Sequence, residues 1–137
     1  MTLTRFTMAH WCILVMALMP IICAGIAKSG MMTRPRRDGG YDNSDPRAWL
    51  ARQGAWRARA NNAQANTFEA LPFFFAAVLV AHQLQAVQIA VDVLAVVFVV
   101  LRVAYVYFYV TDRAGVRSIT WSLALLVNIM ILLLGYR

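Results

Sequence analysis

Charged residues are scarce in this sequence. Only 14% of its 137 residues are charged, whereas 61% are hydrophobic. A soluble domain of this length usually carries about a quarter charged residues. The composition therefore excludes an ordinary water-soluble domain and predicts a membrane protein, with residues 1–137 forming a single membrane domain.

Cysteine is also rare, and both copies, Cys12 and Cys23, lie in the first apolar run. No histidine or cysteine near them has the spacing of metal ligands, so we predict no metal site. The two thiols would lie about three turns apart on one helix, which is too far for a disulfide bond. We expect them to be small apolar fillers of a helix.

Acidic side chains are few, with six against thirteen basic ones, and the formal net charge is +7. Such a balance is typical of proteins that meet nucleic acid or an anionic membrane surface. Here the basic residues are nearly all arginines, and they lie mainly in connections that flank apolar runs. This pattern predicts contacts with membrane lipids and no nucleic-acid partner.

Four apolar runs cover residues 9–27, 60–84, 87–110 and 119–136. Each is near the ~20 residues that a helix needs to cross the hydrocarbon. None alternates as a strand does, and within lipid only helices or closed barrels satisfy the backbone. We therefore predict an all-α fold, an integral membrane four-helix bundle. The first run follows Arg5 as a signal peptide would, but its cleavage motif is weak, so we interpret it as a retained helix.

The connections between the runs differ in charge. The loop 28–59 is rich in arginine, the link between the second and third runs is uncharged, and the link 111–118 carries Arg113 and Arg117. The positive-inside rule then places the first and third connections in the cytoplasm. Both termini of this multi-pass protein are predicted to lie outside the cytoplasm.

A short helix is predicted inside the long loop, in the stretch SDPRAWLARQGAW. Ser44 or Asp45 would be its N-cap, and Pro46 would occupy the first helical position. Trp49 and Trp56 are seven residues apart and would share one face. We expect an interfacial helix whose tryptophans lie at the level of the lipid headgroups.

Polar residues interrupt the second run at helical spacing. Asn62, Asn66, Glu69 and Phe73 follow the spacing i, i+4, i+7, i+11, which places them on one stripe of a helix. Arg59 extends this stripe by one turn toward the loop 28–59. Ionisable groups within a membrane span indicate a functional site until shown otherwise.

A matching stripe occurs in the third run, where Arg102, Tyr105 and Tyr109 follow i, i+3, i+7. Glu69 and Arg102 each lie about eight residues inside their spans, and so roughly 12 Å deep at ~1.5 Å per residue. A carboxylate and a guanidinium at equal depth can pair, and either one alone would be costly. We therefore expect the two stripes to face each other, with Glu69 and Arg102 paired.

Two interpretations of the stripes remain open. The first is a polar latch that fixes the register of the bundle and binds no ligand. The second is a pocket that opens to the cytoplasm, in which arginines bind carboxylates, asparagines bind amides and the glutamate binds an ammonium group. A zwitterionic, peptide-like ligand needs that mixture, whereas a latch needs only one pair.

The stretch NAQANTFEALPFF resembles the second-helix signature of the MAPEG family, membrane-associated proteins in eicosanoid and glutathione metabolism. Asn66, Glu69 and Pro72 match the last three fixed positions of that signature. The stretch RVAYVYFY resembles the third-helix motif of the family through Arg102, Tyr105 and Tyr109. The four-span layout agrees as well, so the resemblance covers nearly the whole chain.

The resemblance implies a homotrimer of four-helix subunits that uses glutathione as a co-substrate, bound between subunits near the cytoplasmic face. Hydrophobic small molecules would be the second substrate. Arg117, with Arg113 as second choice, would activate the thiol, and Tyr105 could donate a hydrogen bond to the sulfur. The residues implied to bind glutathione are Arg59, Asn62, Asn66, Glu69, Arg102 and Tyr109.

One position departs from the family pattern. The signature has arginine four residues before its asparagine, where this chain has Asn62. Arg59, one turn earlier on the same stripe, could take over that role. The alternative is a non-catalytic membrane protein that binds lipid through the same stripe, so enzymatic activity stays open. A small transporter is disfavoured, because the sequence shows no inverted repeat.

Overall fold

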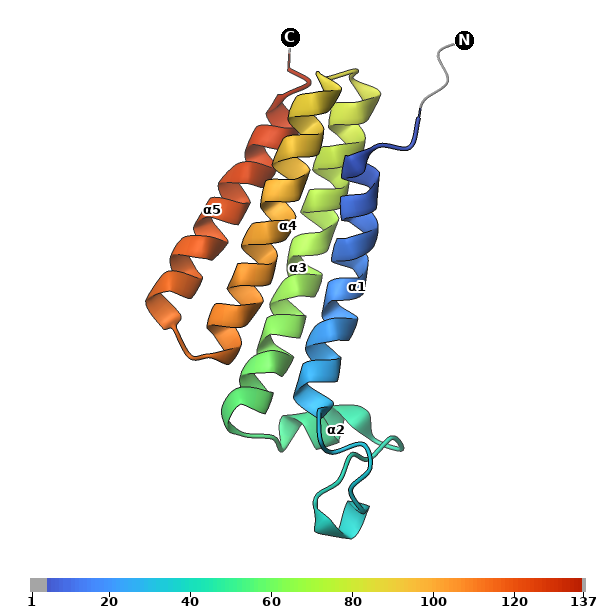
Figure 1. Cartoon of the computed structure of the whole chain (residues 1–137), viewed down its shortest axis with the longest axis vertical. Coiled ribbons are helices and arrows are strands. Elements are labelled where there is room, and N and C mark those ends of the chain that lie inside the picture. Colours follow the sequence, from blue (N-terminus) through green and yellow to red (C-terminus); the bar gives the residue numbers. More distant parts are fainter. Residues whose placement is uncertain (1–4, 137) are drawn as a thin grey trace.

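Four long helices lie side by side in the computed structural model, which describes residues 5–136 (Figure 1). They are α1 (Met8–Lys28), α3 (Ala55–Gln83), α4 (Gln88–Val110) and α5 (Ala114–Leu133). Each is long and apolar enough to cross a membrane. No strand occurs within residues 5–136, so the predicted all-α fold with four membrane helices is confirmed.

The two ends of the bundle carry different segments. The start of α1 and the end of α5 lie at one end, here called the terminal end (Figure 1). The opposite end, here called the arginine-rich end, carries the long connection with a short 3-10 helix, η1 (Arg36–Asp38), and α2 (Pro46–Ala51). The turn from α4 to α5 lies at this end too. Both ends of the described chain therefore fall on one side of any membrane that the four helices cross.

Two helices begin earlier than their apolar runs. α3 starts at Ala55 rather than at 60, and α5 starts at Ala114 rather than at 119. Hydropathy marks only the part of a helix that lies in hydrocarbon, whereas the backbone hydrogen bonds continue through polar residues beside it. The early start of α3 brings Arg57 and Arg59 onto the helix that carries the polar stripe.

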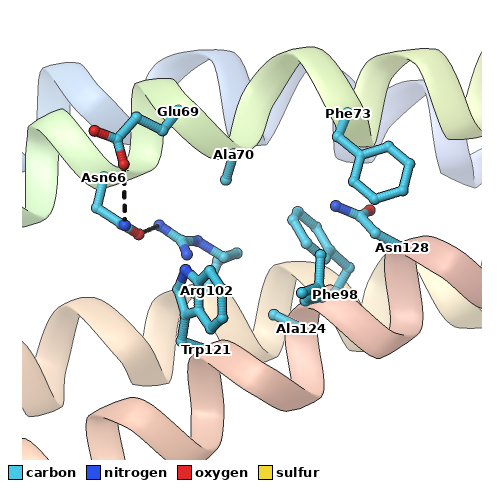
Figure 2. Close-up of a pocket in the computed structure, with 10 residues that line it drawn as sticks. Asn66, Glu69, Ala70, Phe73, Phe98, Arg102, Trp121, Ala124 and Asn128 are labelled. Atoms are coloured by element: carbon cyan, nitrogen blue, oxygen red, sulfur yellow. Dashed lines mark hydrogen bonds between the residues drawn. The ribbon is translucent and has the colours of Figure 1, made fainter.

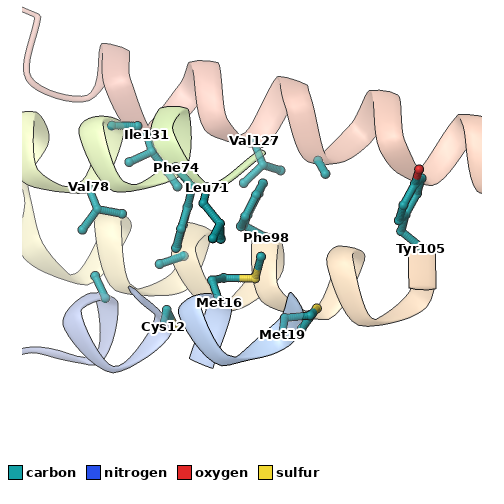
Figure 3. Packing of buried hydrophobic residues seen from close by; sticks show 14 of the residues in the cluster. Cys12, Met16, Met19, Leu71, Phe74, Val78, Phe98, Tyr105, Val127 and Ile131 are labelled. Carbon is teal, nitrogen blue, oxygen red and sulfur yellow. The ribbon is translucent and has the colours of Figure 1, made fainter. Parts of the chain in front are cut away.

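The core lies where α1, α3, α4 and α5 meet (Figure 3). The rings of Phe74 on α3 and Phe98 on α4 stack with centroids 4.3 Å apart and planes 12° apart. Met16 of α1 and Ile131 of α5 are fully buried in the same cluster. The outward faces remain apolar and exposed, as a lipid-facing surface requires. Cys12 and Cys23 are free and buried, as the sequence predicted.

A polar cluster at the terminal end ties α1 to α4. The Asp92 carboxylate accepts hydrogen bonds from the backbone N–H of Ala9 at 2.8 Å and from the side chain of Gln88 at 2.9 Å. His82 lies 3.1 Å from the Gln88 side-chain oxygen, and its ring meets that of His10 edge-on at 4.8 Å. Asp92 therefore satisfies a backbone donor at the N-terminus of α1.

The predicted interfacial helix is shorter than expected. Asp45 is its N-cap, accepting from the N–H of Ala48 at 3.2 Å, and Pro46 is its first residue. α2 ends at Ala51, however, and Trp56 belongs to α3. The expectation that Trp49 and Trp56 share one helical face is therefore wrong. The two residues belong to separate helices, because α2 ends before α3 starts at Ala55.

Trp49 is buried within the connection. Its indole N–H donates to the carbonyl of Gly39 at 3.3 Å, and its ring meets Tyr41 edge-on. Gly40 is buried beside it, and a Cβ atom there would collide with the carbonyl oxygen of Arg34. The Gly39-Gly40 pair thus allows a close backbone approach in a folded connection.

Candidate functional site

Two adjoining cavities lie among α3, α4 and α5. The inner cavity has a volume of about 140 Å³ and is shown in Figure 2. The end cavity, nearer the arginine-rich end, has a volume of about 420 Å³. Asn66 and Trp121 line both, so the two spaces share a rim. The other residues that line the end cavity are Tyr105, Tyr109, Arg117, Ser118 and Ser122.

Arg102 lies at the centre of the site. Its side chain is only 1% exposed, although it carries a permanent charge. Its Nη2 donates to Oδ1 of Asn66 at 3.1 Å and to Oγ1 of Thr67 at 3.2 Å. Its Nε is buried and has no hydrogen-bond partner within residues 5–136. One donor of Arg102 is therefore left without an acceptor in the described chain.

Glu69 reaches Arg102 only through Asn66. The amide of Asn66 donates from Nδ2 to Oε2 of Glu69 at 3.3 Å, while its oxygen accepts from Arg102 (Figure 2). The salt bridges of the described chain do not include Arg102. The expected direct pair of Glu69 and Arg102 is therefore wrong, because the carboxamide of Asn66 lies between them. The two stripes do face each other, as expected. They are joined by hydrogen bonds that run from Arg102 through Asn66 to Glu69.

Aromatic rings connect Arg102 to a second arginine. The Arg102 guanidinium lies 4.3 Å from the ring centroid of Tyr105, which is almost fully buried. Tyr105 meets Tyr109 edge-on at 5.6 Å, and the guanidinium of Arg117 lies 4.4 Å from the ring of Tyr109. Cations over aromatic faces are held by the ring quadrupole. The i, i+3, i+7 stripe of α4 thus contributes both tyrosines to the end cavity.

Arg117 and Arg113 differ in their relation to the site. Arg117 lines the end cavity, whereas Arg113 is the exposed N-cap residue of α5 and lines neither cavity of the described chain. Of the two arginines, therefore, Arg117, the first choice from the sequence, is the one that lies at a cavity. Its guanidinium packs over the ring of Tyr109.

Arg59 and Asn62 lie apart from the cavities. Arg59 donates from Nε to the carbonyl of Val110 at 3.0 Å, and its Nη1 lies 3.8 Å from the carboxylate of Asp112. The last carbonyls of a helix lack partners within the helix, so Arg59 satisfies one at the end of α4. Asn62 is exposed, and it does not contribute to either cavity of residues 5–136.

Two site residues were not singled out from the sequence. The Thr67 hydroxyl accepts from Arg102 and donates to the carbonyl of Ala63 at 2.7 Å. Trp121 forms part of the rim between the cavities. Thr67 could have been found as a small hydroxyl beside Asn66, because a buried guanidinium needs several acceptors. Trp121 carried no such signal.

Asn128 is a buried polar residue of α5. Its side chain is 3% exposed and lines the inner cavity, but its Oδ1 is buried with no partner among residues 5–136.

The arrangement can hold an anionic ligand that also carries an ammonium group. Arg102 and Arg117 supply positive charge without a carboxylate partner within the described residues, and Glu69 supplies negative charge at the rim. Residues 5–136 contain no group of three or more His, Cys, Asp or Glu side chains that could hold a metal ion. Arg102, Arg117 and Glu69 can bind such a ligand through their charges and through hydrogen bonds.

Comparison with family models gives one match. The model of the MAPEG family matches residues 8–136, which include all four long helices and the lining of both cavities. Neither the curated proteins nor the solved structures include a significant match to this chain.

Proposed function

The chain belongs to the MAPEG family, and on this premise we propose that it binds glutathione in the end cavity and across the rim that this cavity shares with the inner one. There it would meet Asn66, which lines both cavities, and Glu69 and Arg102, which line the inner one. As a membrane protein of this family it has four helices of spanning length. The observation that carries the proposal is the chain of hydrogen bonds from Arg102 through Asn66 to Glu69, in which Asn66 lies at the rim shared by the two cavities.

The groups at this rim match those of glutathione. Glutathione has two carboxylates, one ammonium group, two peptide amides and a thiol. Arg117 and the free Nε of Arg102 can bind carboxylates, Glu69 can bind the ammonium group, and the Asn66 carboxamide can bind a peptide amide. A volume of about 420 Å³ lies within the usual range for small-molecule sites, roughly 300–1,000 Å³.

The same residues support a transferase or peroxidase reaction on lipophilic electrophiles. A cysteine-type thiol has a pKa of about 8.5, so little of it is thiolate at neutral pH. Arg117 would stabilise the thiolate by its charge and so lower the pKa of the bound thiol. The Tyr105 hydroxyl would donate a hydrogen bond to the sulfur. The substrate would reach the site from the bilayer, past the exposed apolar faces of the helices.

Assembly and orientation follow from the same premise. We propose a homotrimer in which glutathione lies between subunits, with the arginine-rich end in the cytoplasm. The arginines of the connection between α1 and α3 support this orientation through the positive-inside rule.

A second function is favoured by one observation. Arg59, the candidate replacement for the family arginine, is held by Val110 and Asp112 and does not reach the site. A site without that arginine would bind glutathione weakly. The alternative is therefore a non-catalytic protein whose polar stripe binds the headgroup of a lipid while the inner cavity takes an apolar part of it.

Calorimetric titration of glutathione into the detergent-solubilised protein tests the proposal. Saturable binding that is lost in Glu69→Gln would support it, because the glutamine keeps a hydrogen-bonding oxygen for Asn66 but removes the charge that meets the ammonium group. Asp38→Asn is the matched control, since it removes one negative charge from the exposed connection. Absence of binding to the wild-type protein would favour the lipid-binding alternative.

A further inference from the structure

One side chain that lines the inner cavity, Asn128, has an acceptor without a donor in the described chain. Oδ1 of Asn128 is buried and unpartnered among residues 5–136, and the side chain as a whole is 3% exposed. Figure 2 shows this carboxamide between Phe73 and Phe98, two aromatic rings that line the cavity with it. Leaving such a group unpaired costs free energy, which a ligand with a donor would recover.

The shape of the inner cavity fits a single ring. Its volume of about 140 Å³ is close to the roughly 150 Å³ of an engineered apolar cavity that admits benzene. The space exists because Ala70 and Ala124 present only methyl groups on opposite helices. Aromatic side chains surround it, and aromatic rings pack on one another edge-on or offset.

We propose that the inner cavity binds a ring that carries a hydroxyl group, a phenol-like part of the lipophilic substrate. The hydroxyl donates to Oδ1 of Asn128 and accepts from its Nδ2, because a hydroxyl can do both at once. This inference rests on the proposed function, in that the same substrate would meet glutathione at the rim shared with the end cavity. A hydrocarbon ring of equal size would leave Oδ1 unpaired.

The position of Asn128 sets the orientation of that substrate. Asn128 follows Trp121 by seven residues on α5, which at ~1.5 Å per residue places it roughly 10 Å from the shared rim. The hydroxylated ring therefore enters the inner cavity first. The part of the substrate that meets the end cavity lies about two helical turns away from the hydroxyl.

A pair of nearly equal-sized probes tests the proposal. Para-fluorophenol and para-fluorotoluene differ at one position, where a hydroxyl replaces a methyl group, and fluorine NMR can follow the binding of each in detergent. Asn128→Leu should weaken para-fluorophenol at least tenfold and leave para-fluorotoluene unchanged or tighter. The affinity of each probe for the variant is compared with the affinity of the same probe for the wild-type protein. The partition of the probe into detergent is the same in both measurements and therefore does not affect the ratio.

The control is Thr120→Val. Thr120 is also buried on α5, but its hydroxyl donates to the carbonyl of Val116 within the helix, and it is not among the residues that line the inner cavity. This variant should leave the affinity for both probes unchanged. An equal loss for both probes in Asn128→Leu, or no loss for either, would overturn the proposal.

A second variant keeps the test decisive if Asn128→Leu does not fold. Ala124→Leu fills the cavity from α5, one helical turn before Asn128, and should exclude both probes. Continued binding of para-fluorophenol to that variant would overturn the proposal. Glutathione is absent from these titrations, so a protein that distinguishes the probes but binds no glutathione contradicts only the proposed function. A protein that binds glutathione but does not distinguish the probes contradicts only this inference.

Discussion

The guanidinium of Arg102 on α4 donates to the side-chain oxygen of Asn66 on α3 at 3.1 Å, across 36 residues of sequence. This bond joins the two polar stripes at the depth where the sequence placed both. It also orients the Asn66 carboxamide so that its nitrogen faces Glu69. The charges of Arg102 and Glu69 are thereby coupled while a neutral amide keeps them apart.

Replacing Arg102 by leucine should abolish the ligand site. In Arg102→Leu the oxygens of Asn66 and Thr67 lose their donor, and an unpaired buried polar group costs about 1–3 kcal/mol. We expect the affinity for glutathione to fall at least tenfold and the thermal midpoint to fall as well. Titration calorimetry and thermal unfolding in detergent measure the two effects. The exposed Arg113→Leu is the matched control, and wild-type affinity in Arg102→Leu would contradict the site.

Arg117 should control the ionisation of the bound thiol. Its guanidinium lines the end cavity beside Tyr109, so Arg117→Leu should reduce the thiolate fraction of bound glutathione at neutral pH by about tenfold. Arg117→Lys should retain much of that fraction, because it keeps the charge. Ultraviolet difference absorbance of the thiolate measures it. An unchanged thiolate signal in Arg117→Leu would rule out Arg117 as the activating group.

Asp92 should stabilise the start of α1. Asp92→Ala removes the acceptor of the Ala9 N–H and a negative charge at a helix N-terminus, and losing a capping acceptor costs about 1 kcal/mol. Thermal unfolding in detergent should show a lower midpoint for this variant. Asp38→Ala, in the exposed connection, should leave the midpoint unchanged. Equal midpoints for the two variants would show that the bond to Ala9 adds no stability.

Phe74 should be a main determinant of core stability. Phe74 is fully buried and stacks on Phe98, so Phe74→Ala leaves a cavity and should cost roughly 3 kcal/mol or more. Phe68→Ala, on the same helix, removes an equal ring whose residue is 54% exposed and should cost far less. Unfolding by denaturant in detergent compares the two. A similar loss in both variants would show that burial in this bundle does not set the contribution of the ring.

Much of the fold followed from local pattern. Four apolar runs of spanning length predicted four membrane helices, because lipid leaves a backbone few other ways to satisfy its hydrogen bonds. The helical spacing of Asn66 and Glu69, and that of Arg102, Tyr105 and Tyr109, predicted which residues share a face. Within the connection, the Asp45-Pro46 pair marked the start of α2.

Other features depended on contacts between distant segments. The Asn66 carboxamide lies between Glu69 and Arg102 because its side chain extends toward α4. The spacing of residues along α3 alone does not predict how far a side chain extends toward another helix. Arg59 turned to Val110 and Asp112, which lie more than fifty residues later in the chain. Asp92 had no visible partner in the sequence, because its partner is a backbone N–H on α1.

The sequence by itself determined that this chain is an all-α membrane protein with two polar stripes, and it carried the motifs of the MAPEG family. Periodicity and hydropathy are local properties, and they suffice for those conclusions. Only the tertiary structure decided that Arg117 lines the end cavity, that Arg59 and Asn62 lie away from it, and that Asn128 is unpaired beside the inner cavity. Those outcomes depend on how three helices pack, because each helix alone leaves the partners of its polar side chains unspecified.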